Sequence, residues 1–418
     1  MNGPQRLQGG SAPLRLLPAG PRRRIEAYAG RHQSLSVIIT VIILGLLLPV
    51  LAQLPILNGF GRTNDFVDGY ANAGVFILLA LGLNVVVGLA GLLDLGYAAF
   101  FAIGSYTYAF AASPFSGFDF PFWPLLIVGA FVAAIFGILL GAPTLRLRGD
   151  YLAIVTLGFG EIVPIVFLNS DTYTKGTNGI SGIYQPSLPA IANLPQFDLP
   201  LIGHFNGTLG GSFGFGNPWP YYFTVLAIIA VAVILLYRLQ DSRLGRAWMA
   251  IREDELAASA MGINTVTTKL LAFAIGATTS GLAGVFNASK LAFVSPDQFD
   301  FTVSFTVLAM VVLGGMGNIW GVAVGAFALY EIQSVFLKQL TIFFQPLGIP
   351  VLSSIDFVQY QFLLYGLALV GMMLLRPEGL FPSRQRKREL LAELKGIDEV
   401  EPEIAFEAPE VTPEDPDL

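Results

Sequence analysis

A dense cluster of charged residues lies between two apolar segments in the second half of the chain. It runs from Asp241 to Lys269 and reads DSRLGRAWMAIREDELAASAMGINTVTTK. The neighbouring segments, YYFTVLAIIAVAVILLY and LLAFAIGATTSGLAGVF, contain no charged residue. Charged side chains at this density stay in water, whereas apolar runs of this length belong in a bilayer. We therefore expect the cluster to lie at the membrane surface and to be available to a cytoplasmic partner. The segment between the two predicted spans, residues 240–268, is called the polar loop below.

The polar loop also has a helical pattern. Leu244, Ala247, Trp248 and Ile251 follow the spacing of one face of a helix, and the charged residues fall mainly elsewhere. This predicts one or two short amphipathic helices. Such helices have two possible roles: an anchor lying on the membrane surface, or a coupling helix that fits into a groove on a cytoplasmic ATPase. The spacing alone leaves both open.

A second set of chemically interesting residues consists of carboxylates inside apolar stretches. Asp94 lies in GLAGLLDLGYAAFFAIGSYTY, where Gly96 and neighbouring glycines allow a helix to break. An ionisable residue at membrane depth is a functional hypothesis by default, so Asp94 and Gly96 are candidates for the translocation path. If Asp94 lies at the cytoplasmic interface instead, its charge stays near water at little cost in free energy. In that case a transport role is not needed to explain it.

Glu161 is a third candidate for the path, because Pro164 follows it and disturbs the hydrogen bonding of the same predicted helix. The same residue could equally be a structural, hydrogen-bonded carboxylate. Glu331 is a weaker example of the same kind. Elsewhere, Gly317, Gly321 and Gly325 repeat every four residues, which favours close helix packing over a pore-lining role.

Several kinds of chemistry find no support. The chain has no cysteine and two histidines, and it contains neither GxxxxGK[ST] nor HExxH. We therefore expect no catalytic residue, no metal site and no cofactor, and we assign any ATP hydrolysis to a separate partner. Short arginine runs are explained by the membrane, so nucleic-acid binding is not expected.

Composition fixes the fold class. Of 418 residues, 54% are hydrophobic and 12% are charged, and the mean hydropathy is +0.66. A soluble domain carries about 25% charged residues. We predict an all-α polytopic membrane protein with about ten transmembrane helices, some of them short or broken at glycines. The predicted spans are 35–54, 72–88, 90–112, 122–143, 151–169, 220–239, 269–288, 303–317, 320–337 and 357–375.

Charge distribution orients these spans. Arginines precede the first span, Arg146 and Arg148 follow the fourth, the polar loop follows the sixth, and a basic run follows the tenth. With ten spans and a cytoplasmic N-terminus, all four groups fall on the cytoplasmic side, as the positive-inside rule requires. Both termini are therefore expected in the cytoplasm.

The chain divides into three predicted regions. Residues 1–34 form a basic cytoplasmic segment, and residues 35–376 form the transmembrane domain, with a long external loop at 170–219 that reads as a lid, a docking surface or simple filler. Residues 377–418 form a cytoplasmic tail whose last 21 positions hold nine acidic residues and four prolines. This composition is typical of disordered, solvated segments.

Four blocks resemble one family. They are GLAGLLDLGYAAFFAIGSYTY, LRLRGDYLAIVTLGFGEIV with the downstream TNGISGI, RLGRAWMAIREDELAASAMGINTVTTKLLAFAIGATTSGLAGV, and VVLGGMGNIWGVAVGA. In order and spacing the chain resembles the permease subunits of branched-chain amino acid ABC importers, of the LivM type. It departs from them at Asp94, where the family commonly has a small hydroxyl residue, and at Val322, where it often has proline.

The resemblance implies an ATPase contact in the polar loop. The positions that match this contact are Gly245, Arg252, Glu253, Asp254, Ala257, Ala258 and Gly262. It also implies a second permease subunit, two cytoplasmic ATP-binding subunits, an external solute-binding protein and surrounding membrane lipid as partners, in a bacterial plasma (inner) membrane. Branched-chain amino acids are then the expected solutes.

Other functions remain open at this level. Related permeases carry urea or short amides and have similar blocks. An ion-coupled secondary transporter would use Asp94, Glu161 and Glu331 as ion ligands. A structural membrane scaffold would need no ATPase at all.

Overall fold

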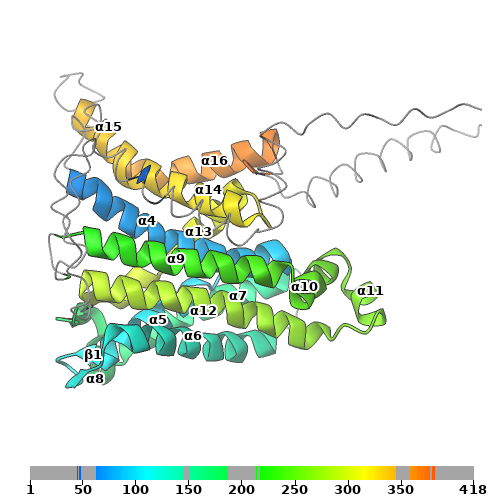
Figure 1. Ribbon diagram of the computed structural model, residues 1–418, viewed down its shortest axis with the longest axis horizontal. Coiled ribbons are helices and arrows are strands. Elements are labelled where there is room, and N and C mark those ends of the chain that lie inside the picture. The colour runs from blue at the N-terminus through cyan, green and yellow to red at the C-terminus, as the bar shows by residue number, and fades with distance from the viewer. Residues whose placement is uncertain are drawn as a thin grey trace, which may run out of the picture.

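The computed structural model describes residues 63–144, 150–186, 217–344, 357–376 and 379–381, together with Gly45, Leu47, Leu48 and Phe213. These residues form a helical bundle (Figure 1), which confirms the all-α class. The helices are α4 (Thr63–Leu83), η1 (Asn84–Leu89), α5 (Ala98–Ala111), α6 (Phe122–Thr144), α7 (Asp150–Asn169), α8 (Asp171–Thr174), η2 (Gly176–Asn178), α9 (Trp219–Gln240), α10 (Arg243–Glu253), α11 (Glu255–Ala260), α12 (Thr265–Leu291), η3 (Pro296–Phe299), α13 (Phe301–Gly314), α14 (Ile319–Glu331), η4 (Ile332–Phe336), α15 (Leu337–Phe344), η7 (Phe357–Tyr360) and α16 (Gln361–Leu375).

Among the described residues, seven stretches are long and apolar enough to cross a membrane, and two shorter apolar helices, Ala98–Ala111 and Phe357–Met372, accompany them. Together they match nine of the ten predicted spans, which confirms a polytopic membrane protein. The remaining predicted span, 35–54, lies outside the described residues except for three helical positions. The N-terminal segment, the turn with Arg146 and Arg148, and the acidic tail also lie outside them.

The second and third spans meet at a break, as their glycines predicted, although the helix boundaries differ from the predicted ones. The second span is longer than expected and ends as a π-helix, η1, in which all six residues are buried. The chain is then non-helical until α5 begins at Ala98, because Gly91 adopts a φ of +70° and turns the backbone. Asp94 and Gly96 therefore precede the helix in which they were expected.

A second break separates α13 from α14. Gly315 and Gly317 adopt φ values of +107° and +82°, which L side chains rarely reach. Asn318 then caps α14, since its side chain accepts a hydrogen bond from the backbone amide of Trp320 at 3.1 Å. The two spans are consequently short helices joined by a glycine turn.

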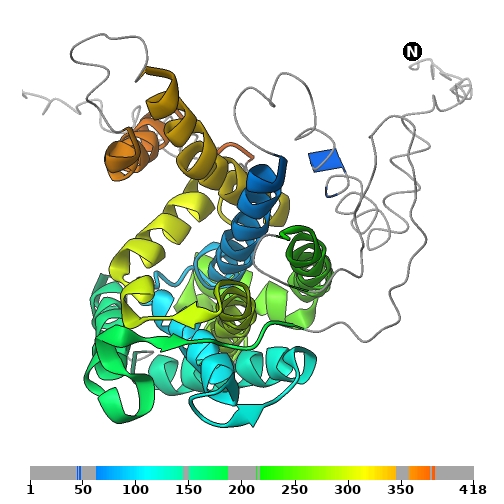
Figure 2. The same cartoon turned by 90° about the vertical axis from the view of Figure 1, so that its left-hand side faces the viewer.

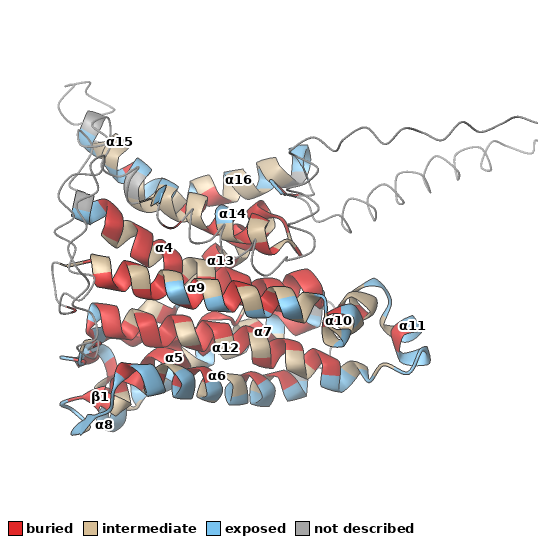
Figure 3. Ribbon diagram, viewed as in Figure 1, coloured by how far each residue is buried: buried red, intermediate tan, exposed pale blue. Residues whose placement is uncertain are grey.

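The core is built around α12, which packs against α4, α5 and α6. Seen end-on, α4, α5, α6 and α9 lie around it (Figure 2), and α12 and α4 are largely buried while α6 exposes one side (Figure 3). Glycines bring the backbones together: a Cβ at Gly104 would lie 2.5 Å from the carbonyl oxygen of Gly281, and one at Gly284 would lie 2.4 Å from that of Phe101. Small residues at such contacts are how membrane helices approach closely.

Two short antiparallel strand pairs lie at the end of the bundle opposite α10 and α11. Strand β1 (Ala112–Ser113) pairs with β2 (Phe118–Asp119), and β3 (Ile180–Ser181) pairs with β4 (Phe293–Val294). The second pair attaches the described start of the predicted external loop to the segment that follows α12.

Candidate coupling site

The polar loop forms two helices, α10 and α11, that protrude from one end of the bundle beyond α9 and α12 (Figure 1). Side-chain caps define each helix start. Ser242 caps α10 by accepting from the Gly245 amide, and Asp254 ends α10 and caps α11 by accepting from the amides of Leu256 and Ala257 at 2.8 and 3.0 Å. Each cap satisfies backbone amides that a helix start leaves free. The structure thus has the two short helices that the spacing allowed.

The apolar face of α10 packs on the protein itself. Trp248 is fully buried, and its indole Nε1 donates a hydrogen bond to the carbonyl oxygen of Thr268, at 2.7 Å, in the first turn of α12. Ile251 and Gly245 are buried beside it, and a Cβ at Gly245 would lie 2.2 Å from the carbonyl oxygen of Gln240. The face predicted from the sequence therefore holds α10 against the bundle, and this favours a rigid coupling element over a membrane-surface anchor.

Arg252 points toward the transmembrane core. Its guanidinium Nη1 donates to the carbonyl oxygen of Gly88, in η1, at 2.6 Å. The side chain also covers Gly91, where an added Cβ would lie 2.7 Å from Arg252 Cγ. A hydrogen bond from a charged donor is roughly twice as strong as a neutral one. Arg252 thus joins α10 to the end of the second span.

An ion pair joins α11 to α12. Lys269 Nζ lies 2.7 Å from Glu255 Oε1, and the two side chains are 7% and 30% exposed. Ala258 is buried on the same helix, whereas Glu253, Asp254, Ala257 and Gly262 are exposed. The seven positions predicted for the ATPase contact therefore divide into an inward group and an outward group.

The outer surface of this protrusion carries two apolar side chains that the sequence analysis did not select. Leu256 is 66% exposed and Met261 is 83% exposed. Ala257, between them in the sequence, is exposed as well, and the exposed Glu253 and Asp254 precede them. Apolar side chains that project from a polar protrusion are typical of a protein contact. Their exposure became evident only once the inward face of α10 was known.

Asp94 lies in a buried site between α5, α6, α7 and α12. Its Oδ1 accepts from the Gly96 amide at 2.9 Å, and within the described residues Oδ2 has no hydrogen-bond partner. A small cavity beside it is lined by Thr156, Phe159 and Phe273 among others. Gly96 allows α5 and α7 to approach, since a Cβ there would lie 2.0 Å from the Thr156 carbonyl oxygen.

The other carboxylates lie elsewhere. Glu161 is exposed on α7, and Glu331, at the end of α14, has a buried Oε1 that lacks a partner among the described residues. In the part of the chain that the structure describes, no group of three or more His, Cys, Asp or Glu side chains could hold a metal ion.

Two of the three predicted packing glycines, Gly321 and Gly325, lie at the α13–α14 contact. A Cβ at Gly321 would lie 2.4 Å from the carbonyl oxygen of Gly314, and one at Gly325 would lie 2.5 Å from its Cα. Gly317 has a different setting, because its amide donates to Asn84 Oδ1 at 2.8 Å. This bond joins the glycine turn to η1.

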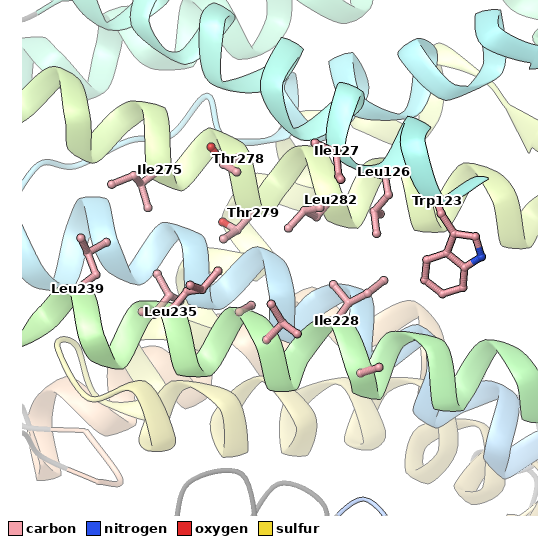
Figure 4. A pocket seen from close by; sticks show the side chains of 14 residues that line it. Trp123, Leu126, Ile127, Ile228, Leu235, Leu239, Ile275, Thr278, Thr279 and Leu282 are labelled. Atoms are coloured by element: carbon pink, nitrogen blue, oxygen red, sulfur yellow. The ribbon is translucent and has the colours of Figure 1, made fainter. Parts of the chain in front are cut away.

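An apolar cavity of about 570 Å³ lies between α6, α9 and α12 (Figure 4). Its lining includes Trp123, Ile228, Leu235 and Leu282, and its hydroxyl groups are on Thr278 and Thr279. Both hydroxyls donate to carbonyl oxygens of α12, at 2.7 and 2.8 Å. The lining therefore suits an aliphatic chain and offers no charged partner to the ends of an amino acid.

Lys290, near the end of α12, forms an unforeseen charged cluster with α4. Its ammonium lies 2.8 Å from Asp68 Oδ1 and donates to Asn72 Oδ1 at 2.5 Å. Asn72 Nδ2 in turn donates to Asp68 Oδ2 at 3.1 Å. A lysine two residues after the predicted span 269–288 was the available signal, but its partners in α4 are far away in the sequence.

Comparison with known proteins adds a consistent set of relatives. The family model described as the permease component of branched-chain amino acid transport systems matches residues 66–375. The high-affinity branched-chain amino acid transport system permease protein LivM of Escherichia coli is 41% identical over 321 residues, which is 76% of this chain and 70% of that protein. No solved structure matches.

More distant relatives point the same way. A probable branched-chain amino acid transport permease protein LivM of Methanocaldococcus jannaschii is 27% identical over 350 residues, covering 74% of this chain and 91% of the relative. The high-affinity branched-chain amino acid transport system permease protein LivH of Escherichia coli is 28% identical over 269 residues, which is 63% of this chain and 82% of that protein. The region that the family model matches, residues 66–375, contains most of the bundle, the polar loop and both glycine breaks.

Proposed function

The chain belongs to the family of permease components of branched-chain amino acid transport systems, and on that premise we propose that α10 and α11 are the place where a cytoplasmic ATPase engages it. The chain is a permease subunit of a branched-chain amino acid importer, and it is a multi-pass membrane protein. Its relatives are transport permeases rather than enzymes. ATP hydrolysis is assigned here to the partner.

The observation that carries this proposal is the arrangement of α10 and α11. One face is fixed to the bundle by Trp248 and Arg252, and the other exposes Leu256 and Met261. A coupling element needs both properties, because it must bind a moving partner and pass that movement into the spans. A loosely attached loop would absorb the movement instead.

The wider assembly follows from the same premise. We propose that this chain assembles with a second permease of the LivH kind, two ATP-binding subunits and an external solute-binding protein. The assembly would lie in a bacterial inner membrane, with both termini of this chain in the cytoplasm. The LivH relative supports a pair of related permeases. Asp94, Gly96 and Glu161 remain the proposed residues of the translocation path.

A cross-linking experiment tests the proposed ATPase contact. The chain has no cysteine, so a single introduced cysteine carries a unique photoactivatable label. Met261→Cys, at an 83% exposed position, should form an adduct with the ATP-binding subunit in the assembled transporter. Tyr173→Cys is the matched control, because Tyr173 is 70% exposed in α8 at the opposite end of the bundle. The proposal would be contradicted if position 173 formed an adduct with the ATP-binding subunit. It would also be contradicted if position 261 formed none with that subunit in a complex that transports.

A further inference from the structure

Two hydrogen bonds, one half-buried and one buried, connect α10 to the glycine turn between α13 and α14. The first runs from Arg252 in α10 to the carbonyl oxygen of Gly88, at 2.6 Å, across 164 residues of sequence. The second runs from the amide of Gly317 to Asn84 Oδ1, at 2.8 Å, across 233 residues. Gly88 and Asn84 both belong to η1, so this π-helix lies between the two bonds.

The packing around η1 leaves little free space at either bond. A Cβ at Gly88 would lie 2.1 Å from Asn84 Oδ1 and 2.6 Å from the Gly317 amide nitrogen. Asn84 is 1% exposed, and the other five residues of η1 are buried as well. In such a close-packed region a displacement at Gly88 moves its neighbours instead of being absorbed by a void.

The π-helix is itself suited to rearrangement. At its end the Ala90 amide donates to the Val85 carbonyl oxygen at 3.1 Å, and the Leu92 amide donates to that of Val86 at 3.0 Å. These bonds replace the regular α-helical pattern, and π-helical turns occur mostly as short segments at functional sites. Gly91, with its φ of +70°, lies two residues after the end of η1 and against the Arg252 side chain.

The glycine turn is the third part of the connection. Gly315 and Gly317 both have positive φ, and the residues after α16 also return to this turn. The Leu380 amide donates to the Leu313 carbonyl oxygen at 2.9 Å, and Asn318 Nδ2 donates to that of Phe381 at 2.9 Å. A movement of Gly317 therefore reaches α13, α14 and the end of α16 together.

We propose that Arg252 and Asn84 are positioning residues that carry movement of α10 through η1 to the glycine turn at Gly315–Gly317. This inference rests on the proposed function, since it needs a partner that moves α10. It gives Arg252 an inward role, distinct from that of the exposed residues that meet the ATPase. Movement of α10 would then reach the bundle at the α13–α14 break rather than along whole helices.

The test uses the full transporter in proteoliposomes and measures leucine uptake per ATP hydrolysed. Arg252→Met keeps the apolar stem and removes the donor, and Asn84→Leu removes the acceptor at nearly constant volume. Each should lower the coupling ratio about tenfold while ATP hydrolysis continues, because each deletes one hydrogen bond of the connection. Arg252→Lys retains a donor and should recover part of the loss.

The double variant gives the sharpest result. If both residues act in one connection, Arg252→Met with Asn84→Leu should be no worse than the poorer single variant, whereas independent effects would multiply. Arg246→Met is the matched control on the same helix, since Arg246 is exposed and its Nη1 donates to the Asp241 carbonyl oxygen at 2.8 Å. It should leave the coupling ratio unchanged.

A structural readout accompanies the transport assay. In Arg252→Met, hydrogen–deuterium exchange should increase in a peptide covering residues 313–319, although position 252 is remote in sequence. Unchanged exchange there, or multiplicative loss in the double variant, would overturn the connection while the transporter itself still works. Failure of the unmodified complex to take up leucine with ATP would instead overturn the proposed function.

Discussion

Trp248 and Thr268 join α10 to α12, the helix at the centre of the bundle. The indole Nε1 of Trp248, a fully buried side chain, donates to the carbonyl oxygen of Thr268 at 2.7 Å. Because Thr268 lies in the first turn of α12, any tilt of α10 acts on the most central span. The attachment combines a large buried ring with a directional bond.

The first prediction separates these two contributions. Trp248→Phe keeps most of the apolar contact and loses the hydrogen bond, which costs about 1 kcal/mol. Trp248→Ala also leaves a cavity and costs about 3–5 kcal/mol. Thermal unfolding of the purified complex should therefore show a small decrease in Tm for the first variant and a large one for the second. Equal Tm values for the two variants would show that the ring does not hold α10.

The second prediction concerns the pair formed by Lys290 and Asp68. The Lys290 side chain is 6% exposed, whereas that of Asp68 is 51% exposed. Removing Asp68 leaves a buried ammonium without its counter-charge, which costs about 3–5 kcal/mol, whereas removing Lys290 leaves a carboxylate that water can reach. Asp68→Ala should thus be much less stable than Lys290→Met.

The combination of the two changes is the control for this asymmetry. Lys290→Met should restore stability to Asp68→Ala, because no buried charge then remains. The melting temperatures of the three variants check this directly. Greater damage from Lys290→Met than from Asp68→Ala would contradict the account of the pair.

The third prediction uses two glycines with opposite surroundings. Gly104→Ala should disrupt the α5–α12 contact, since its Cβ would lie 2.5 Å from the Gly281 carbonyl oxygen. Gly158→Ala is the matched control in α7, where a Cβ meets nothing within 4 Å. Alanine is about 1 kcal/mol better than glycine inside a helix, so Gly158→Ala should be neutral or stabilising. The yield of folded protein of each variant is measured by size-exclusion chromatography. Equal losses of yield in the two variants would show that the close approach of the backbones at Gly104 does not cause the damage.

The fourth prediction addresses Asp94 as a path residue. Asp94→Asn preserves an acceptor for the Gly96 amide, which now bonds to Oδ1 at 2.9 Å, so the variant should fold and assemble with the ATPase. Uptake should nevertheless decrease if the charge of the carboxyl group acts in translocation. Leucine uptake at equal amounts of assembled complex measures this. Normal uptake by Asp94→Asn would remove Asp94 from the proposed path.

Local periodicity predicted much of the fold. Apolar runs located nine spans that the structure describes, and the spacing of Trp248 and Ile251 identified the face of α10 that is buried. Glycines also predicted that some helices are short or broken, and breaks occur at Gly91 and at Gly315–Gly317. These features depend on residues close together in the chain, which is why a single sequence contains them.

The contacts that assemble the site were not predictable in this way. Arg252 meets Gly88 across 164 residues, and Lys290 meets the backbone oxygen of Asp68 across 222. Such pairs result from the packing of whole helices, which helical periodicity does not specify. The inward direction of Arg252 and the exposure of Met261 therefore became evident only from the folded bundle.

The most direct test of the central claim is leucine uptake into proteoliposomes that contain this chain, its partner permease, the ATP-binding subunits and the solute-binding protein. We predict uptake that requires ATP on the side of α10 and α11, and that is lost in Leu256→Asp with Met261→Asp although the chain remains in the membrane. Uptake driven by an ion gradient in vesicles without the ATP-binding subunits would contradict the claim, as would ATP-driven uptake that the double variant leaves unchanged.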